Sequence, residues 1–204
     1  EVSSATVQVS AAANGSISSE AIKESIKIAN QYNSDNKGVA KSAKVTSIQT
    51  TYTNDTQATI SADVVKELQS MEKPVDLEVS KMDGDKVAYT WKMKADSIES
   101  IAEEKVIPIN TKVAVKDTAT NSIDEEKINE LAKKDNDVEI KKQVVEFAHD
   151  GKLPEKTEVT VAVDTTKFTD TVYYFHFYKE KNALVYTGKA DVKNGYVTMV
   201  LDHC

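Results

Sequence analysis

The stretch VDLEVSKMDGDKVAYTWKM, residues 75–93, decides how the chain folds. Polar and apolar residues alternate on both sides of Asp83-Gly84, a pair typical of a tight turn. Alternation with a period of two indicates strands that each bury one face. The stretch therefore predicts a β-hairpin with Trp91, the only tryptophan, as a core anchor on its inward face. The inward series are Val75, Leu77 and Val79 on one strand, and Val87, Tyr89, Trp91 and Met93 on the other.

Helical periodicity occurs on both sides of this hairpin. Apolar residues recur at helical spacing in residues 18–33, 61–71 and 122–135. Each segment has a serine near its start that is able to cap the first turn. We expect Ser19, Ser61 and Ser122 to be these caps, the last in a capping box with Glu125.

The second half of the chain is richer in strand patterns. From Leu153 onward, short β-type segments follow one another at a spacing of roughly ten residues, which is typical of sandwiches and barrels. The sequence therefore predicts an α+β protein of two packed lobes. Residues 1–104 would form a mixed α/β lobe that contains the hairpin, and residues 105–204 a β-sandwich-like lobe.

Charge and composition exclude several classes of partner. The net charge is −7, and all 26 cationic residues are lysines, so the arginine forks that recognise phosphates and guanine edges are absent. We therefore expect no nucleic-acid partner. No window approaches the roughly 20 apolar residues of a membrane span, so we expect no membrane insertion. The single cysteine excludes an internal disulfide and leaves the compartment open.

No spacing of residues indicates catalysis or a cofactor. His149, His176 and His203 are far apart, and none is paired with another histidine or cysteine at ligand spacing, so we expect no metal. Only six glycines are present, and they form no phosphate-binding loop, so we expect no cofactor of that kind. The expectation is a protein that is not an enzyme.

The run YYFHFY, residues 173–178, is the strongest candidate for a binding surface. In an extended strand Tyr174, His176 and Tyr178 share one face, and we name them as candidate ligand-binding residues. Aromatic side chains on both faces are also typical of a central strand that is covered on both sides. Exposure of either face as a planar strip of rings would favour a binding module.

Two passages resemble modules of surface proteins in low-GC Gram-positive bacteria (Firmicutes). They are VAYTWKMKADSI, residues 87–98, and the segment from FAHDGKLPEKTEVTVAVD (residues 147–164) through YYFHFY to GYVTMVLDHC at residue 204. The resemblance covers roughly residues 56–204. Such modules are non-catalytic parts of adhesin-like or cellulosome-associated proteins, so the resemblance implies an extracellular location at the cell surface or cell wall.

The last residues also resemble the end of the β-domain of the ankyrin and netrin-receptor type. Some members cleave themselves before a serine, whose hydroxyl attacks the preceding carbonyl while a histidine acts as base. The resemblance would make His203 that base and place Cys204 where those members have phenylalanine. It implies a self-cleaving β-domain processed after Cys204, whereas a simple fragment boundary would end the chain at the same place.

From these observations we expect a non-catalytic extracellular module that has a structural or interaction role in a bacterial surface protein. Its partners would be other surface proteins or a polysaccharide. A carbohydrate-binding module that uses the aromatic strands is the first alternative, and the self-cleaving β-domain is the second.

Overall fold

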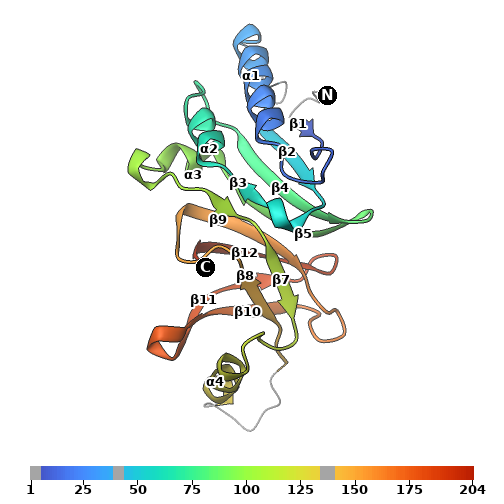
Figure 1. The fold of residues 1–204 in the computed structure, drawn as a ribbon, viewed down its shortest axis with the longest axis vertical. Coiled ribbons are helices and arrows are strands. Elements are labelled where there is room, and N and C mark those ends of the chain that lie inside the picture. Colours follow the sequence, from blue (N-terminus) through green and yellow to red (C-terminus); the bar gives the residue numbers. More distant parts are fainter. Residues whose placement is uncertain (1–5, 39–43, 134–140) are drawn as a thin grey trace.

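A computed structural model describes residues 6–38, 44–133 and 141–204 (Figure 1). The α-helices in these ranges are α1 (Ser19–Asp35), α2 (Ala62–Gln69), α3 (Ala95–Ser100) and α4 (Ser122–Ala132). The strands are β1 (Thr6–Val9), β2 (Ser47–Tyr52), β3 (Thr59–Ile60), β4 (Asp76–Asp83), β5 (Lys86–Met93), β6 (Ile109–Asn110), β7 (Val113–Lys116), β8 (Val144–Phe147), β9 (Lys152–Ala162), β10 (Thr171–Tyr178), β11 (Ala183–Asp191) and β12 (Tyr196–His203).

A six-stranded sheet in the order β1-β2-β4-β5-β9-β12 organises the molecule. Strands β1, β2 and β4 run parallel, and the remaining neighbours pair antiparallel. The predicted hairpin of residues 75–93 is confirmed as β4 and β5, with a positive φ of 59° at Gly84 in its turn. With helices beside a mixed sheet, the α+β class is confirmed.

The large sheet contains strands from both predicted lobes. β5 pairs with β9 from Tyr89↔Val161 to Lys92↔Glu158, so the hydrogen-bonded sheet continues across the boundary placed between residues 104 and 105. That one domain ends at residue 104 and another begins at residue 105 stays a prediction. The pairing joins residues about seventy positions apart, and local sequence patterns contain no signal for it.

One face of the large sheet forms the core. Residues that lie opposite each other in register share a face of the sheet. One such row crosses all six strands, and every residue in it is buried. Its members are Val9, Thr50, Val79, Trp91, Val159 and Met199. The buried faces of α1, α2 and α3 join the same hydrophobic cluster beside β1, β2 and β4 (Figure 1).

Two smaller ribbons complete the β-rich second half, β7–β8 and β10–β11. Phe147 of β8 makes an edge contact with Trp91, with ring centroids 5.9 Å apart. Tyr174 of β10 receives a hydrogen bond on its hydroxyl oxygen from the Val200 amide of β12, at 3.2 Å. Both ribbons are therefore fastened to the large sheet through its core strands and its β12 edge (Figure 1).

The opposite face of the large sheet is polar. The register places Thr51, Ser80, Thr90, Thr160 and Thr198 in one uncharged row across five strands. Neighbouring hydroxyls in this row bond to each other, Ser80 to Thr90 at 2.9 Å and Thr160 to Thr198 at 2.8 Å. Alternation of core and polar positions along each strand follows from this one-sided burial.

The helix caps correct two of the three sequence expectations. Ser61 caps α2 as predicted, because its hydroxyl accepts from the Val64 amide. In α1 the cap is Ser18, whose hydroxyl accepts from the Ala21 amide, so Ser19 is the first helical residue.

In α4 the cap is Asn121 and not Ser122. The amide oxygen of Asn121 accepts from the backbone N–H of Ile123 and of Asp124. Glu125 accepts from the Ala119 amide instead of completing the predicted box. Asparagine caps as well as serine does, and the register of the turn decides between the two neighbours.

None of the helices in the described ranges combines the length and the apolar composition that crossing a lipid bilayer requires.

Candidate ligand-binding surface

The outward face of the β10–β11 ribbon exposes three aromatic rings. Tyr173 is 64% exposed, Phe175 53% and Tyr186 55%. The register explains why these rings meet. Phe175 lies opposite Tyr186, and Tyr173 lies two residues before Phe175 on the same face of β10. We call Tyr173, Phe175 and Tyr186 the aromatic patch. Exposed rings gathered in this way are typical of an interaction surface.

The rings of the aromatic patch are in contact but not coplanar. Tyr186 lies between the other two, with its centroid 6.5 Å from Tyr173 and 5.7 Å from Phe175. The planes are inclined by 45° to Tyr173 and by 69° to Phe175. The patch is therefore a twisted set of faces and edges, and not the planar strip considered from the sequence.

The residues named from the sequence lie on the other face of the ribbon. Tyr174, His176 and Tyr178 are half-buried and face β12 and the core. These residues attach the ribbon to β12, through the Tyr174 hydroxyl and through ring contacts of His176 and Tyr178 with His203. Phe177, on the outward face, is half-buried as well.

Sequence reasoning missed Tyr186. The turn at residues 179–182 was recognisable, and Asn182 closes it with a positive φ of 46°. Counting outward from this turn pairs Phe175 with Tyr186, because the register is regular from Tyr178↔Ala183 up to that pair. The bulge between Tyr174 and Phe175 shifts the register only beyond this pair, where Gly188 lies opposite Tyr174.

His176 and His203 form a compact ring cluster between the ribbon and β12. Their centroids are 4.8 Å apart, and Tyr178 lies 4.2 Å from His176. Burial lowers the pKa of His176, and the neighbouring His203 lowers it further. Nδ1 of His203 is buried and has no hydrogen-bond partner among the described residues.

Cys204 is held by the backbone. Its amide donates to the Gly151 carbonyl and its carbonyl accepts from the Gly151 amide, each at 2.9 Å. Burial raises the pKa of the Cys204 thiol to about 12. A thiol of this kind stays protonated at neutral pH and is a poor nucleophile. The self-cleavage hypothesis for His203 and Cys204, in which Cys204 is not the nucleophile, stays a prediction.

A polar hollow adjoins the end of the ribbon. It is lined by Thr160, Asp191, Lys193, Asn194, Tyr196 and Thr198, and we call it the polar hollow. The hollow forms where the chain leaves β11 and enters β12 through a tight turn. Asn194 and Gly195 both have positive φ, 52° and 80°, as a type I′ turn requires. Asp191 links the hollow to the ribbon, because it accepts from the Thr171 hydroxyl at 2.9 Å.

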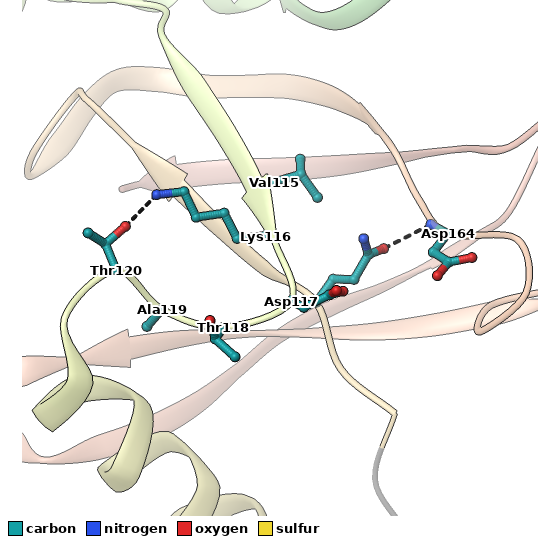
Figure 2. Close-up of a pocket in the computed structure, with 8 residues that line it drawn as sticks. Val115, Lys116, Asp117, Thr118, Ala119, Thr120 and Asp164 are labelled. Carbon is teal, nitrogen blue, oxygen red and sulfur yellow. Dashed lines mark hydrogen bonds between the residues drawn. The ribbon is translucent and has the colours of Figure 1, made fainter.

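A second hollow lies beside the start of α4 (Figure 2). It is lined by Val115, Lys116, Asp117, Thr118, Ala119, Thr120, Gln143 and Asp164. Figure 2 shows the Lys116 side chain turned toward Thr120, to which it donates a hydrogen bond.

The polar groups around this second hollow satisfy one another. Glu146 accepts from the Thr120 amide and hydroxyl and pairs with Lys116, and these contacts lower the pKa of its carboxyl group. Lys167 pairs with Asp117 at 2.6 Å. Because these groups already bind each other, the arrangement fastens the α4 region and offers few groups to a ligand.

A network of hydrogen-bonded hydroxyl groups lies at one side of the core. Tyr89 donates to Asp55 at 3.0 Å, and Thr111 donates to the Ala58 carbonyl at 2.7 Å. The Tyr52 hydroxyl lies 2.8 Å from that of Tyr89 and 3.0 Å from that of Thr111. The network ties the segment around residues 55–58 to the sheet.

This network predicts alkaline destabilisation. Burial raises the pKa of both Tyr52 and Tyr89, and the Asp55 charge adds to the effect at Tyr89. Tyrosines of the unfolded chain ionise near pH 10 while these two stay protonated in the fold, so the free energy of unfolding should fall as pH rises above about 10. Urea titrations at pH 9 to 11.5 measure this fall, and Tyr89→Phe should make it shallower. An equal slope in both proteins would contradict the assignment.

In the described parts of the chain, no group of three or more His, Cys, Asp or Glu side chains is placed to hold a metal ion. No protein-family model, curated protein or solved structure matches the chain.

Proposed function

We propose that the chain is a non-catalytic interaction module that binds its partner through the aromatic patch. The observation that carries the proposal is the exposure of Tyr173, Phe175 and Tyr186 together on one face of the ribbon. Burying aromatic rings supplies much of the binding energy at interfaces, and leaving them in water has a cost that a binding role explains.

The support of the patch also suits binding. The inward face of the ribbon is fixed by the Tyr174 hydroxyl on β12 and by the packing of His176 against His203. Rings on a fixed strand ribbon lose little freedom when a ligand binds, and this raises affinity. The sequence resemblance supports our proposal that such a module lies outside the cell, at the surface or in the wall of a Gram-positive bacterium, with other surface proteins or polysaccharide as partners.

Binding to isolated cell walls tests the proposal. Labelled protein would be titrated onto sacculi from a low-GC Gram-positive bacterium that retain their attached proteins and polymers. We expect saturable binding by the native sequence. The triple variant Tyr173→Ala/Phe175→Ala/Tyr186→Ala should bind at least about tenfold more weakly, because centrally placed aromatic residues dominate such interfaces.

A matched control removes exposed apolar side chains elsewhere. Ile123 on α4 is 60% exposed and Val200 on β12 is 46% exposed, and both lie outside the patch. Ile123→Ala/Val200→Ala should bind as the native chain does. If the triple variant also binds as the native chain does, the patch is not the binding surface. Circular dichroism of each variant confirms that it is folded.

A further inference from the structure

We propose that Asn194 is a site of spontaneous deamidation in the folded chain, and that the fold protects Asn14 from the same reaction. The sequence contains two Asn-Gly pairs, Asn14-Gly15 and Asn194-Gly195, and both asparagines are exposed. A following glycine favours the reaction in each pair, because no Cβ shields its backbone nitrogen. The two sites differ in how the fold holds the peptide plane between asparagine and glycine. The reaction does not depend on the proposed function.

Deamidation takes place within the chain and consumes only water. The backbone nitrogen of the glycine attacks Cγ of the asparagine. A bond between that nitrogen and Cγ forms, the bond between Cγ and Nδ2 breaks, and the glycine N–H proton leaves with Nδ2 as ammonia. Water then opens the cyclic imide at one of its two carbonyls. Opening at Cγ gives aspartate, whereas opening at the backbone carbonyl gives isoaspartate, in which the main chain runs through the former side chain.

The turn at Asn194-Gly195 is one peptide rotation away from the geometry of the imide. The five-membered ring holds ψ of the asparagine near about −120°, which is the ψ of the first central residue in a type II′ turn. The type I′ and type II′ turns share a positive φ at that residue, and Asn194 already has a φ of 52°. They differ in the sign of φ at the second residue, and Gly195 is able to adopt either sign.

No hydrogen bond opposes this rotation among the described residues. Neither the Asn194 carbonyl nor the Gly195 amide has a partner there, and the side chain of Asn194 has none either. The bonds that close the turn lie on both sides of this plane and not within it. The Lys193 amide donates to the Tyr196 carbonyl at 2.8 Å, and the Tyr196 amide donates to the Lys193 carbonyl at 3.0 Å. The plane is therefore free to turn while the strands stay paired.

The corresponding peptide plane at Asn14-Gly15 is bound at both of its polar groups. The Gly15 amide donates to the Ala12 carbonyl at 2.8 Å, and the Asn14 carbonyl accepts from Nδ2 of Asn54 at 3.3 Å. The Asn14 side chain is also held, because its Oδ1 accepts from the amide and the hydroxyl of Ser16 at 3.1 Å and 2.6 Å. Rotation of this plane would break both backbone bonds, and movement of Cγ would release Ser16.

Reaction at Asn194 would change the charge of the polar hollow. Aspartate and isoaspartate each add a carboxylate where Asp191 already contributes one. Isoaspartate also lengthens the backbone by one methylene group, in a turn that has only two residues between its closing hydrogen bonds. The modification therefore acts on the junction of β11 and β12.

Peptide mapping measures both sites in one sample. The native chain, folded and in urea, would be incubated at mildly alkaline pH, quenched with acid and digested with pepsin, because the acid also halts the reaction. Mass spectrometry follows the replacement of NH2 by OH at each site, and electron-transfer fragmentation distinguishes isoaspartate from aspartate. Asn194→Gln and Asn14→Gln are matched controls that each remove one site, since glutamine would have to form a larger ring and reacts far more slowly.

In the folded chain, we expect Asn194 to deamidate at least about tenfold faster than Asn14, because two hydrogen bonds must first break at Asn14. In urea, where neither plane is held, the two sites should react at comparable rates, and Asn194 should react about as fast as it does in the folded chain. Equal rates at the two sites in the folded chain would overturn the inference. So would a loss of reaction at Asn194 on folding as large as that at Asn14.

Discussion

Trp91→Ala is expected to lower the free energy of unfolding by about 3–5 kcal/mol, the largest effect of any single substitution considered for this chain. Trp91 is 1% exposed and occupies the middle of the buried row between Val79 and Val159. Its ring also meets Phe147 of β8 edge-on, so the truncation opens a cavity where the large sheet meets the β7–β8 ribbon.

Urea denaturation followed by far-ultraviolet circular dichroism measures this loss, since the variant removes the only tryptophan and with it the fluorescent probe. Trp91→Phe should cost clearly less, because it keeps an aromatic ring and removes the indole N–H, which has no hydrogen-bond partner in the part of the chain that the structure describes. Ile123→Ala, at an exposed site, should stay within about 0.5 kcal/mol. A loss below about 1 kcal/mol for Trp91→Ala would mean that the core is packed differently.

Gly188→Ala is expected to destabilise the chain by about 1–3 kcal/mol, through overpacking beneath the ribbon. A Cβ at residue 188 would lie 2.5 Å from the Tyr174 hydroxyl oxygen and 2.6 Å from Cζ of the same ring. Tyr174 is half-buried and its hydroxyl accepts from the Val200 amide, so the ring cannot move aside without loosening the ribbon from β12.

A double-mutant cycle with Tyr174→Ala isolates this contact. Tyr174→Ala alone loses packing and the hydrogen bond, but it also vacates the space that the new methyl group needs. Gly188→Ala/Tyr174→Ala should therefore cost less than the sum of the two single variants in urea denaturation. Strict additivity would show that residue 188 and the Tyr174 ring are not in contact.

Local patterns predicted the elements of this fold that depend on neighbours in sequence. The hairpin of residues 75–93 and the burial of Trp91 follow from alternation and turn chemistry, and both are confirmed. The joining of β5 to β9 could not be predicted in this way. That pairing depends on which of several β-branched strands fits beside the hairpin, and every candidate has similar alternation.

The candidate surface was predictable only in part. The run at residues 173–178 pointed to the correct strand, but both of its faces are aromatic, so hydrophobicity does not distinguish inward from outward. Tertiary contacts determine which face of β10 is inward, because the Tyr174 hydroxyl contacts β12 and the His176 ring contacts His203. The exposed set is therefore Tyr173 and Phe175, joined by Tyr186 from the neighbouring strand.

The central claim is that Tyr173 and Tyr186 contact the ligand, and photochemically induced nuclear polarisation of tyrosine side chains tests it most directly. In the free protein, Tyr173 and Tyr186 should give polarised signals, whereas the buried Tyr52 and Tyr89 should give none. Saturation with soluble cell-wall fragments released by a muramidase should suppress the signals of Tyr173 and Tyr186. Signals that persist at saturation would show that the ligand binds elsewhere and would contradict the account.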